Sequence, residues 1–555
     1  MALIAVCFIT FIGTAYFLYG SFIARQFQLN NATITPARRI NDGEDFVPTK
    51  PFYLFAQHFS AIAAAGPIAG PILACQSWGW IPCLIWIGLG VVFIGAVHDF
   101  SSLTASVRHE AQSIAEIARE RMGIKAGIAL MAFIWIALIY VMVAFTDITA
   151  STFTTVMPEL SGISVQFNQG GAVAASSILY LLLALLLGII QKYFNPPLWL
   201  VTLLFVPATL VVVWLGTCIS TWFLLDVKTW GLLILAYCFV ASLVPVWLLL
   251  QPRGYLGGFV LYLALALGVI GIFFGGYSIQ QEAFTGWSTP DGSITTCLFP
   301  FLFVTIACGA CSGFHGLVCS GTTSKQIDKE SHMHPVGYGA MLAEGFVAFI
   351  SLVTIMMISS SAAKTIKNPG TIYGNGIGEF LTLLIGKQHL AFAITFGAMA
   401  FSTFVFDTLD VCTRLGRYIV QELFHWHTRF GAIMGTLITI LLPAFFISTA
   451  PPGSWKNFWV LFGASNQLLA ALTLLVITVW LAQEKKKFWF TLLPMLFVLS
   501  ITLCSLGALT WENFKTAQGF DVKRINGIVS LTLIGLALYL IGVAVKTVRK
   551  PKLSG

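Results

Sequence analysis

The stretch from Phe299 to Lys325 contains residue types that could bind a ligand inside a membrane. It is apolar and long enough to cross a bilayer, yet Cys308 to Gly316 in its middle supply thiols, a hydroxyl, an imidazole and three glycines. Backbone that leaves helical form at membrane depth is tolerated only where it is buried in protein or lines a water-filled cavity. We therefore predict an interior binding site at this interruption.

A second stretch, from Gln57 to Pro71, has the same character. His58 and Ser60 precede Gly66-Pro67 within an apolar span. Proline removes a helical hydrogen-bond donor and glycine permits unusual backbone dihedrals, so a break is expected here as well. Two interrupted spans in corresponding places of two halves indicate the binding site of a secondary transporter.

The ends of two broken helices would offer unpaired amides and carbonyls to a substrate. The positive N-terminal ends suit a carboxylate, which peptides, amino acids and pyruvate all carry. Hydroxyl and imidazole groups nearby could add polar contacts. We expect the substrate to be bound by His58, Ser60, Gly66, Pro67, Thr305, Gly309, Ser312, Gly313 and His315.

The two histidines leave more than one role open. A neutral imidazole can be a hydrogen-bonded core residue, a proton carrier or a metal ligand. His58 and His315 would approach each other if the interrupted spans pack together. Cys308, Cys311 and His315 have the spacing C-x2-C-x3-H, but a structural zinc site needs a fourth ligand. We expect no metal and keep these three residues as the only candidates.

Ionisable groups inside apolar spans are costly and are candidates for binding a coupling ion. Asp99 could carry a proton or contact substrate, or it could pair with Arg108 at the membrane surface. Glu344 has no cation within one helical turn, so a structural role is hardest to assign to it. The sequence predicts that Asp99, Glu344 and Asp407 take part in ion coupling.

Two further polar pairs lie in late apolar spans. Asp410 and Arg414 are four residues apart, so we expect an ion pair along one helical face. Asn466 and Gln467, in the segment LFGASNQ, could gate or line the transport path.

Composition places all these residues in an integral membrane protein. Hydrophobic residues make up 57% of the chain, charged residues 9%, and the mean hydropathy is +0.87. The eleven cysteines fall almost wholly in apolar runs, so free thiols are expected. The formal net charge of +8 is interpreted as a topology signal, not as a nucleic-acid surface.

Runs of about twenty apolar residues indicate about fifteen membrane spans. Loops on the side of residues 24–51 hold 22 of the 30 lysines and arginines, which puts the N-terminus outside and the C-terminus in the cytoplasm. The longest polar stretches, such as Lys364–Leu381, are too short to form a domain. The expected spans are 1–22, 52–76, 79–104, 126–155, 172–190, 198–220, 229–250, 257–280, 297–320, 337–362, 388–412, 430–449, 457–482, 487–510 and 525–547.

Other function classes find little support in the sequence. There is no Walker A motif or dinucleotide fingerprint, so neither an ATP-driven pump nor a nucleotide cofactor is expected. The enzyme motifs H-E-x-x-H and G-x-S-x-G are also absent. A channel and a membrane-embedded nutrient sensor remain as alternatives to a transporter.

Eight motifs, in order from about residue 35 to 482, resemble the carbon starvation protein A family. The motifs are NDGEDFVPT (41–49), HFSAIAAAGPIAGP (58–71), GAVHDFSSL (95–103), PVWLLLQPRGYL (245–256), the 299–325 stretch, GYGAMLAEGFVA (337–348), DVCTRLGRYIVQEL (410–423) and LFGASNQLLAAL (461–472).

The resemblance implies a bacterial inner-membrane transporter induced by nutrient limitation, importing peptides and, in some members, pyruvate with protons. The residues alone leave amino acids open as substrates and Na⁺ open as the coupling ion. It implies an all-α polytopic fold with inverted five-helix repeats, similar to the amino acid, polyamine and organocation transporters. The starts of the repeats are seven spans apart, and this odd number permits inversion. The implied organisation is 1–51 (N-terminal helix and loop), 52–220 (repeat one), 229–280 (inserted helices), 297–482 (repeat two) and 487–555 (C-terminal helices and tail).

Overall fold

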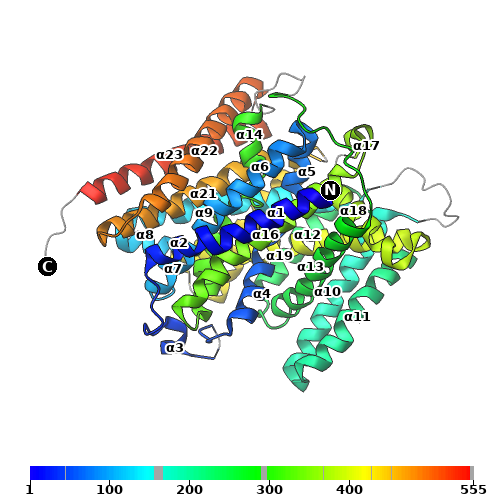
Figure 1. Cartoon of the computed structure of the whole chain (residues 1–555), viewed down its shortest axis with the longest axis horizontal. Helices are drawn as coiled ribbons and strands as arrows, with labels where there is room; N and C mark the ends of the chain where they lie inside the picture. Colours follow the sequence, from blue (N-terminus) through cyan, green and yellow to red (C-terminus); the bar gives the residue numbers. More distant parts are fainter. Residues whose placement is uncertain are drawn as a thin grey trace. The chain divides into compact units, whose positions relative to one another are not determined.

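The computed structural model describes residues 1–43, 45–155, 167–288, 297–366, 368–426, 428–451, 453–519 and 521–549. These residues fold almost entirely into helices (Figure 1), and their only β-pairings are two isolated bridges. Within the membrane every backbone polar group must be satisfied inside its own segment, which a helix achieves and an open strand does not. The all-α fold follows from an apolar sequence in a lipid solvent.

Twelve helices of the described chain are long and apolar enough to span a membrane, or thirteen if the bent pair of residues 51–62 and 66–78 counts as one span. Two other predicted spans coincide with a shorter apolar helix, Val227–Leu243, and with a helix broken between residues 305 and 313. An all-α polytopic membrane protein is confirmed. The number fifteen and the inverted repeat stay predictions.

The contacts divide the chain into two compact units. Unit 1 comprises residues 1–2, 138–282 and 350–459, and unit 2 comprises residues 3–137, 283–349 and 460–555. Three of the boundaries fall within helices, which are α9 (Ile124–Phe153), α16 (Ala340–Met356) and α21 (Trp455–Gln483).

Unit 2 contains the N-terminal helix, both broken spans and the two last helices. Its α22 and α23 lie side by side near the end of the chain (Figure 1). Short π-helical turns continue several helices, notably η2 (Val91–Gly95), η4 (Cys319–Thr323) and η7 (His334–Gly339). Its α-helices are α1 (Ala2–Ala15), α2 (Ser21–Phe27), α3 (Pro36–Ile40), α4 (Pro51–Ile62), α5 (Gly66–Trp78), α6 (Trp80–Gly90), α7 (Ala96–Arg108), α8 (Ile114–Met122), α14 (Leu298–Thr305), α15 (Gly313–Val318), α22 (Trp489–Thr516) and α23 (Val522–Arg549).

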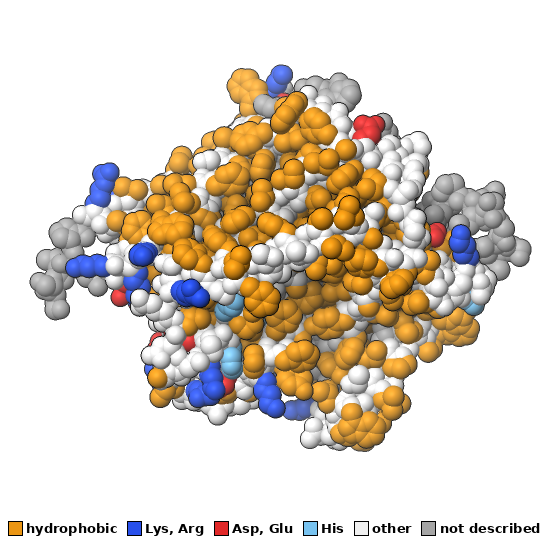
Figure 2. Space-filling model, in the orientation of Figure 1, with side chains coloured by type: hydrophobic (Ala, Val, Ile, Leu, Met, Phe, Trp, Pro, Cys, Tyr) orange, Lys and Arg blue, Asp and Glu red, His pale blue; other side chains and the backbone are white. Residues whose placement is uncertain are grey.

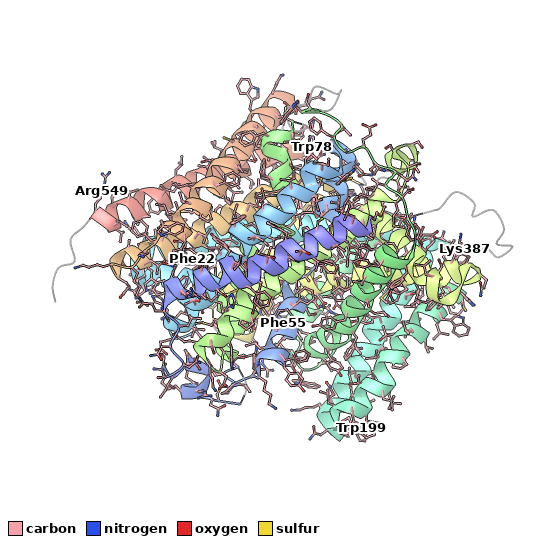
Figure 3. The ribbon with its side chains drawn as sticks, in the orientation of Figure 1. Phe22, Phe55, Trp78, Trp199, Lys387 and Arg549 are labelled. Carbon is pink, nitrogen blue, oxygen red and sulfur yellow. The ribbon has the colours of Figure 1, made fainter. Side chains whose placement is uncertain are left out.

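Unit 1 is built on the long helix α19, against which α10, α11, α12, α13, α18 and α20 all pack. Helices α10 and α11 lie side by side, and Trp199 near the start of α11 is exposed (Figures 1 and 3). Its helices are α10 (Gln169–Phe194), α11 (Leu198–Cys218), α12 (Val227–Leu243), α13 (Leu250–Phe274), α17 (Ser360–Thr365), α18 (Pro369–Ile385), α19 (Leu390–Phe424) and α20 (Arg429–Thr449).

Helix α18 covers most of the polar stretch Lys364–Leu381, for which no span was predicted. Asn368 Oδ1 accepts a hydrogen bond from the backbone N–H of Gly370 at 2.8 Å and so caps the first turn of α18. Glycines then allow close packing on α19, because a Cβ at Gly374 would lie 2.7 Å from that of Ala398. Small residues lower the hydropathy of a helix that is nevertheless mostly buried.

The surface chemistry agrees with a lipid environment. Figure 2 shows hydrophobic side chains over most of the visible face, with lysine and arginine near its margins. Large apolar residues such as Leu182, Leu203 and Trp214 are more than half exposed. Exposure of this extent would be unfavourable in water, so these faces are expected to contact lipid.

Candidate functional site

The first predicted break is present between α4 and α5. Helix α4 ends at Ile62, α5 begins at Gly66, and the two are bent by 46°. His58 lies in the second-last turn of α4 and is buried, whereas Ser60 is half-buried. Pro67 falls in the first turn of α5, where its missing amide costs no intrahelical bond.

The second predicted break is present between α14 and α15. Thr305 is the last residue of α14, Ser312 holds the N-cap position of α15, and Gly313 is its first residue. The connecting segment 306–312 is not helical and contains Gly309. The structure therefore places the expected substrate-binding residues at or next to two helix breaks.

The two breaks pack directly against each other within unit 2. A Cβ added to Gly309 would lie 3.4 Å from Cα of Pro67 and 2.8 Å from Cβ of Ala348. A Cβ at Gly66 would collide with the side chain of Cys308. Close packing between the two breaks therefore favours glycine at both positions.

Four buried side chains form a line of contacts beside the second break, which we call the His–Asp–His–Glu line. Asp99 Oδ1 lies 2.7 Å from His98 Nδ1, and Asp99 Oδ2 lies 2.9 Å from His315 Nδ1. His315 Nε2 lies 3.2 Å from Glu344 Oε2. The side chains come from α7, α15 and α16, and none is more than 1% exposed.

The geometry fixes a minimum number of protons in this line. His315 presents one ring nitrogen to each of two carboxylates, and a neutral imidazole has only one N–H to donate. A second proton must therefore reside on the ring or on one of the acids. The line can store a proton and can pass it along its contacts.

The two acids differ in how well their charged forms are stabilised. Asp99 receives a hydrogen bond at each oxygen, from His98 and from His315. Neither oxygen of Glu344 has a hydrogen-bond partner of good geometry among the described residues, although Oε2 contacts His315. A buried carboxylate without hydrogen bonds gains most from taking up a proton.

Asp99 does not pair with Arg108 in the described structure. Arg108 instead binds Glu330, with Nε to Oε1 at 3.1 Å and Nη2 to Oε2 at 3.0 Å. Asp99 itself is fully buried. The pairing with Arg108 that was left open for Asp99 is therefore contradicted.

His58 belongs to a neighbouring contact, outside this line. Its Nδ1 lies 2.8 Å from Oγ1 of Thr323, and its Nε2 lies 3.8 Å from the thiol of Cys319. Both partners are in η4, which continues α15. The two histidines lie on packed elements of unit 2, and no hydrogen bond joins them in the described structure.

The side chains of Asn466 and Gln467 on α21 form hydrogen bonds with residues on either side of the second break. Asn466 Oδ1 accepts the amide of Phe314 at 2.9 Å, and its Nδ2 donates to Ser312 Oγ at 3.0 Å. Gln467 Nε2 donates to the carbonyl of Phe303 at 2.9 Å. The backbone N–H of Phe314, which was expected to be free for the substrate, is therefore already hydrogen-bonded to Asn466, a predicted gating residue.

No metal-binding group of three or more His, Cys, Asp and Glu side chains is found in the described ranges. The thiol of Cys308 accepts a hydrogen bond from Asn466, and both ring nitrogens of His315 face carboxylates. The C-x2-C-x3-H spacing therefore does not assemble a site in this structure.

The predicted ion pair between Asp410 and Arg414 is wrong. Arg414 Nη2 donates to the backbone carbonyls of Ala241 at 2.7 Å and Val244 at 3.1 Å. Asp410 pairs instead with Arg253 of α13, which also binds Asp407. An arginine side chain is long enough to reach carbonyls on α12, and these compete with the carboxylate one turn away.

Sequence reasoning missed the roles of His98 and Arg253. Adjacent residues on a helix do not normally face each other, so the contact between His98 and Asp99 had no periodic signal. Arg253 lies 154 residues before Asp407. The sequence offered one indication of its role, which is that a charged side chain inside an apolar span is energetically costly and is therefore a candidate functional residue.

Residues 1–377 and 367–505 match the family model of the carbon starvation protein CstA. The peptide transporter CstA of Campylobacter jejuni is 33% identical over 563 residues, covering 88% of this chain and 77% of the relative. The pyruvate/proton symporter BtsT of Escherichia coli is 31% identical, covering 91% of this chain and 81% of the relative.

A manganese transporter of Eremococcus coleocola is similar in fold, with a TM-score of 0.51 at 13% sequence identity, covering 90% of this chain and 96% of the other. The named relatives are transporters, and this chain is a multi-pass membrane transporter, not an enzyme. The match to the family model covers most of the sequence. The chain belongs to the carbon starvation protein CstA family.

Proposed function

We propose that this protein is a secondary active transporter that imports small nutrients bearing a carboxylate, coupled to protons. Peptides, amino acids and pyruvate are the candidate substrates, and the names of its relatives support peptides and pyruvate. The single observation that carries the proposal is the His–Asp–His–Glu line buried beside two packed helix breaks.

The line is proposed to bind the coupling proton. Asp99 holds His315 through one ring nitrogen, and the other ring nitrogen contacts Glu344. Glu344 has the less stabilised anion, so it is assigned as the group that gains and loses the proton in each cycle. Because His315 of the line lies on α15, a change in the charge of the line acts on the second half of a broken helix.

The substrate carboxylate is proposed to bind at the N-terminal ends of α5 and α15. The helix dipole and the amides of the first turn favour an anion there. In the structure Asn466 Oδ1 accepts a hydrogen bond from the backbone N–H of Phe314. A carboxylate oxygen of the substrate could replace Asn466 Oδ1 as the acceptor. Displacement of Asn466 by substrate would link binding to the movement of α21, with Gln467 as the neighbouring contact.

The wider setting is part of the same proposal. The transporter is assigned to the bacterial inner membrane, with its N-terminus outside and its C-terminus in the cytoplasm, and to the response to carbon starvation. Its core is assigned as inverted repeats 52–220 and 297–482 around the breaks. The helices at 229–280 would be an insertion, with residues 1–51 and 487–555 flanking the core.

The test is uptake by proteoliposomes containing the purified full-length chain. Labelled pyruvate, a labelled dipeptide and labelled glycine are offered separately under an imposed inward proton gradient. We expect at least one to accumulate above its outside concentration and a protonophore to abolish this accumulation. Downhill flux without accumulation would indicate a channel. No flux of any substrate, with an Na⁺ gradient also applied, would overturn the transport proposal and favour a sensor.

A further inference from the structure

Unit 1 buries a second group of charges that the proposed proton site does not use. Arg253 of α13 is fully buried and donates through Nε to Asp407 Oδ1 at 2.7 Å. Its Nη1 donates to Asp410 Oδ2, and Asp410 is 3% exposed. Asp407 and Asp410 lie on one face of α19, so a single guanidinium bridges both carboxylates.

Two phenols complete the surroundings of this arginine. The hydroxyl of Tyr237 on α12 donates to Asp410 Oδ2 at 2.9 Å and lies 2.5 Å from Arg253 Nη1. The hydroxyl of Tyr180 on α10 donates to the backbone carbonyl of Arg253 at 2.8 Å. The charged and titratable groups that face Asp410 from the packed elements are Arg253, Asp407, Tyr237 and Cys238.

The group has one negative charge more than it has positive charges. Two carboxylates meet one guanidinium, and phenols and thiols are neutral at pH 7. Arg414 and Arg417, the nearest arginines along α19, donate to the backbone carbonyls of Ala241, Val244 and Ser242. In the described part of unit 1, no other ion pair involves Asp407 or Asp410.

One carboxylate oxygen is buried without a partner. Asp410 Oδ1 has no hydrogen-bond partner among the described residues, whereas Oδ2 has two donors. A buried charge that lacks hydrogen bonds is costly in an apolar environment. A bound proton or a bound cation at this oxygen would remove that cost.

A glycine of α13 packs closely beside the second carboxylate. A Cβ added to Gly257, four residues after Arg253, would lie 3.0 Å from Asp407 Oδ2 and 3.4 Å from the hydroxyl of Tyr180. These two oxygens therefore lie next to the backbone at Gly257, and a side chain there would crowd both of them. Oxygen donors of this kind suit hard cations.

We propose that Asp410 and Asp407, held by Arg253, form a binding site for one monovalent cation, either H⁺ or Na⁺. The group carries one net negative charge, which a monovalent ion neutralises, whereas a divalent ion would leave one net positive charge. Binding of H⁺ forms an O–H bond at Asp410 Oδ1 and takes the proton from solvent. Binding of Na⁺ uses carboxylate oxygens and the Tyr180 hydroxyl. This site goes beyond the proton site proposed in unit 2.

The experiment measures cation binding to the purified full-length protein in detergent, without substrate. Thermal unfolding midpoints are recorded against NaCl, with choline chloride keeping ionic strength constant, and against pH from 5.5 to 9. Asp410→Asn removes the charge at nearly the same volume. Asp226→Asn is the matched control in the same unit, because Asp226 is an exposed N-cap of α12 and asparagine also caps well.

Either of two results would support the site. If the ligand is Na⁺, the wild-type midpoint rises by roughly 2 to 5 °C as Na⁺ reaches a hundredfold excess over its dissociation constant, and the midpoint of Asp410→Asn does not change. If the ligand is H⁺, the wild-type midpoint falls as pH rises toward 9, because the stabilising proton is lost, while Asp410→Asn lacks this fall. Asp226→Asn behaves like wild type in both cases.

Gly257→Ala separates the Na⁺ site from a general effect of charge. It leaves every charge in place but narrows the space beside Asp407, so a Na⁺ response should weaken at least about tenfold in affinity and a proton response should persist. If wild type and Asp410→Asn respond identically to both Na⁺ and pH, the site does not exist. Should Asp410→Asn fail to fold, Asp407→Asn takes its place under the same criteria. These unfolding midpoints do not depend on proton-driven uptake, so this site can fail while the proposed transport function stands, and the reverse.

Discussion

Unit 2 and unit 1 each contain two carboxylates that contact a buried basic side chain, and the two groups differ in the kind of basic side chain. In unit 2 the acids Asp99 and Glu344 face imidazoles, whose ordinary pKa is about 6.5. In unit 1 the acids Asp407 and Asp410 face a guanidinium, which stays charged at every physiological pH. In the first group the imidazoles as well as the acids can gain or lose protons. In the second group the guanidinium stays charged, so the total charge changes only when a carboxylate is protonated or an ion binds.

The two groups also differ in the helices that carry them. The His–Asp–His–Glu line uses His315, which lies three residues into the second half of a broken helix. The group in unit 1 joins α13 and α19, and both run without a break through the charged residues. A charge change on a short half-helix can move it at low cost, whereas Arg253 ties two long helices together.

Removal of Arg253 is expected to have the largest effect. Arg253→Met leaves the buried Asp410 and the partly exposed Asp407 without their cation, and loss of one partner from a buried pair costs about 3–5 kcal/mol. We expect a large fall in folded protein, measured by size-exclusion chromatography and thermal unfolding in detergent. The triple variant Arg253→Met, Asp407→Asn, Asp410→Asn should recover much of the loss. A stable single variant would show that these charges are not a structural requirement.

Replacement of Glu344 should separate coupling from binding. Glu344→Gln keeps the shape but cannot release a proton, so accumulation driven by a proton gradient should fall to background. Exchange of labelled for unlabelled substrate across the membrane should persist, because it needs no net proton movement. Glu120→Gln, at an exposed glutamate of α8 in the same unit, is the matched control. Unchanged accumulation by Glu344→Gln would contradict the assignment.

The two histidines of the line should differ in effect. Asn has an amide that can replace a ring Nδ1–H, so His315→Asn and His98→Asn can each keep a hydrogen bond to Asp99. Only His315 also contacts Glu344. Accumulation should therefore be lost in His315→Asn and reduced by at most about tenfold in His98→Asn. Measuring uptake against external pH checks this, since loss in both variants to the same extent would place His98 on the proton path.

The sequence predicted the breaks because their cause is local. Pro67 prevents α4 from continuing unbroken into α5, and the glycine in residues 306–312 permits non-helical backbone before α15. Glu344 was also recognisable, because one acid in a run of apolar residues stands out. These features need no knowledge of which helices touch.

The partners of the charged residues depended on tertiary packing. Asp410 had a candidate partner four residues away in Arg414, yet its partner is Arg253, 157 residues earlier. Helix α18 was missed because glycines that allow close packing also reduce hydropathy. The contact of His315 with Asp99 joins residues 216 apart, and neither neighbourhood predicts the other.

Gly309→Ala tests whether the packed breaks support the line. The new Cβ would lie 2.8 Å from Cβ of Ala348, and overpacking of this kind costs about 1–3 kcal/mol. We expect lower thermal stability and reduced uptake, both partly restored in the double variant Gly309→Ala, Ala348→Gly. Gly321→Ala is the control, because no atom lies within 4 Å of its added Cβ. Equal stability of all three variants would show that the contact is not tight.

The smallest effect is expected for a pair outside the membrane-spanning segments, where water already stabilises the charges. Arg38 Nε donates to Asp328 Oδ1 at 2.5 Å, and this hydrogen bond lowers the pKa of Asp328 below its ordinary value. A lowered pKa stabilises the folded state above the ordinary value of 3.8 and loses this contribution as pH falls below it. Asp328→Asn should therefore unfold slightly earlier than wild type at pH 7, and the two midpoints should converge toward pH 3. Exposed pairs contribute little, and salt screens them, so added salt should also narrow the difference at pH 7. A difference that persists unchanged at both pH values would mean that the side chain of Asp328 acts through its shape and not its charge, in contrast to the two buried groups.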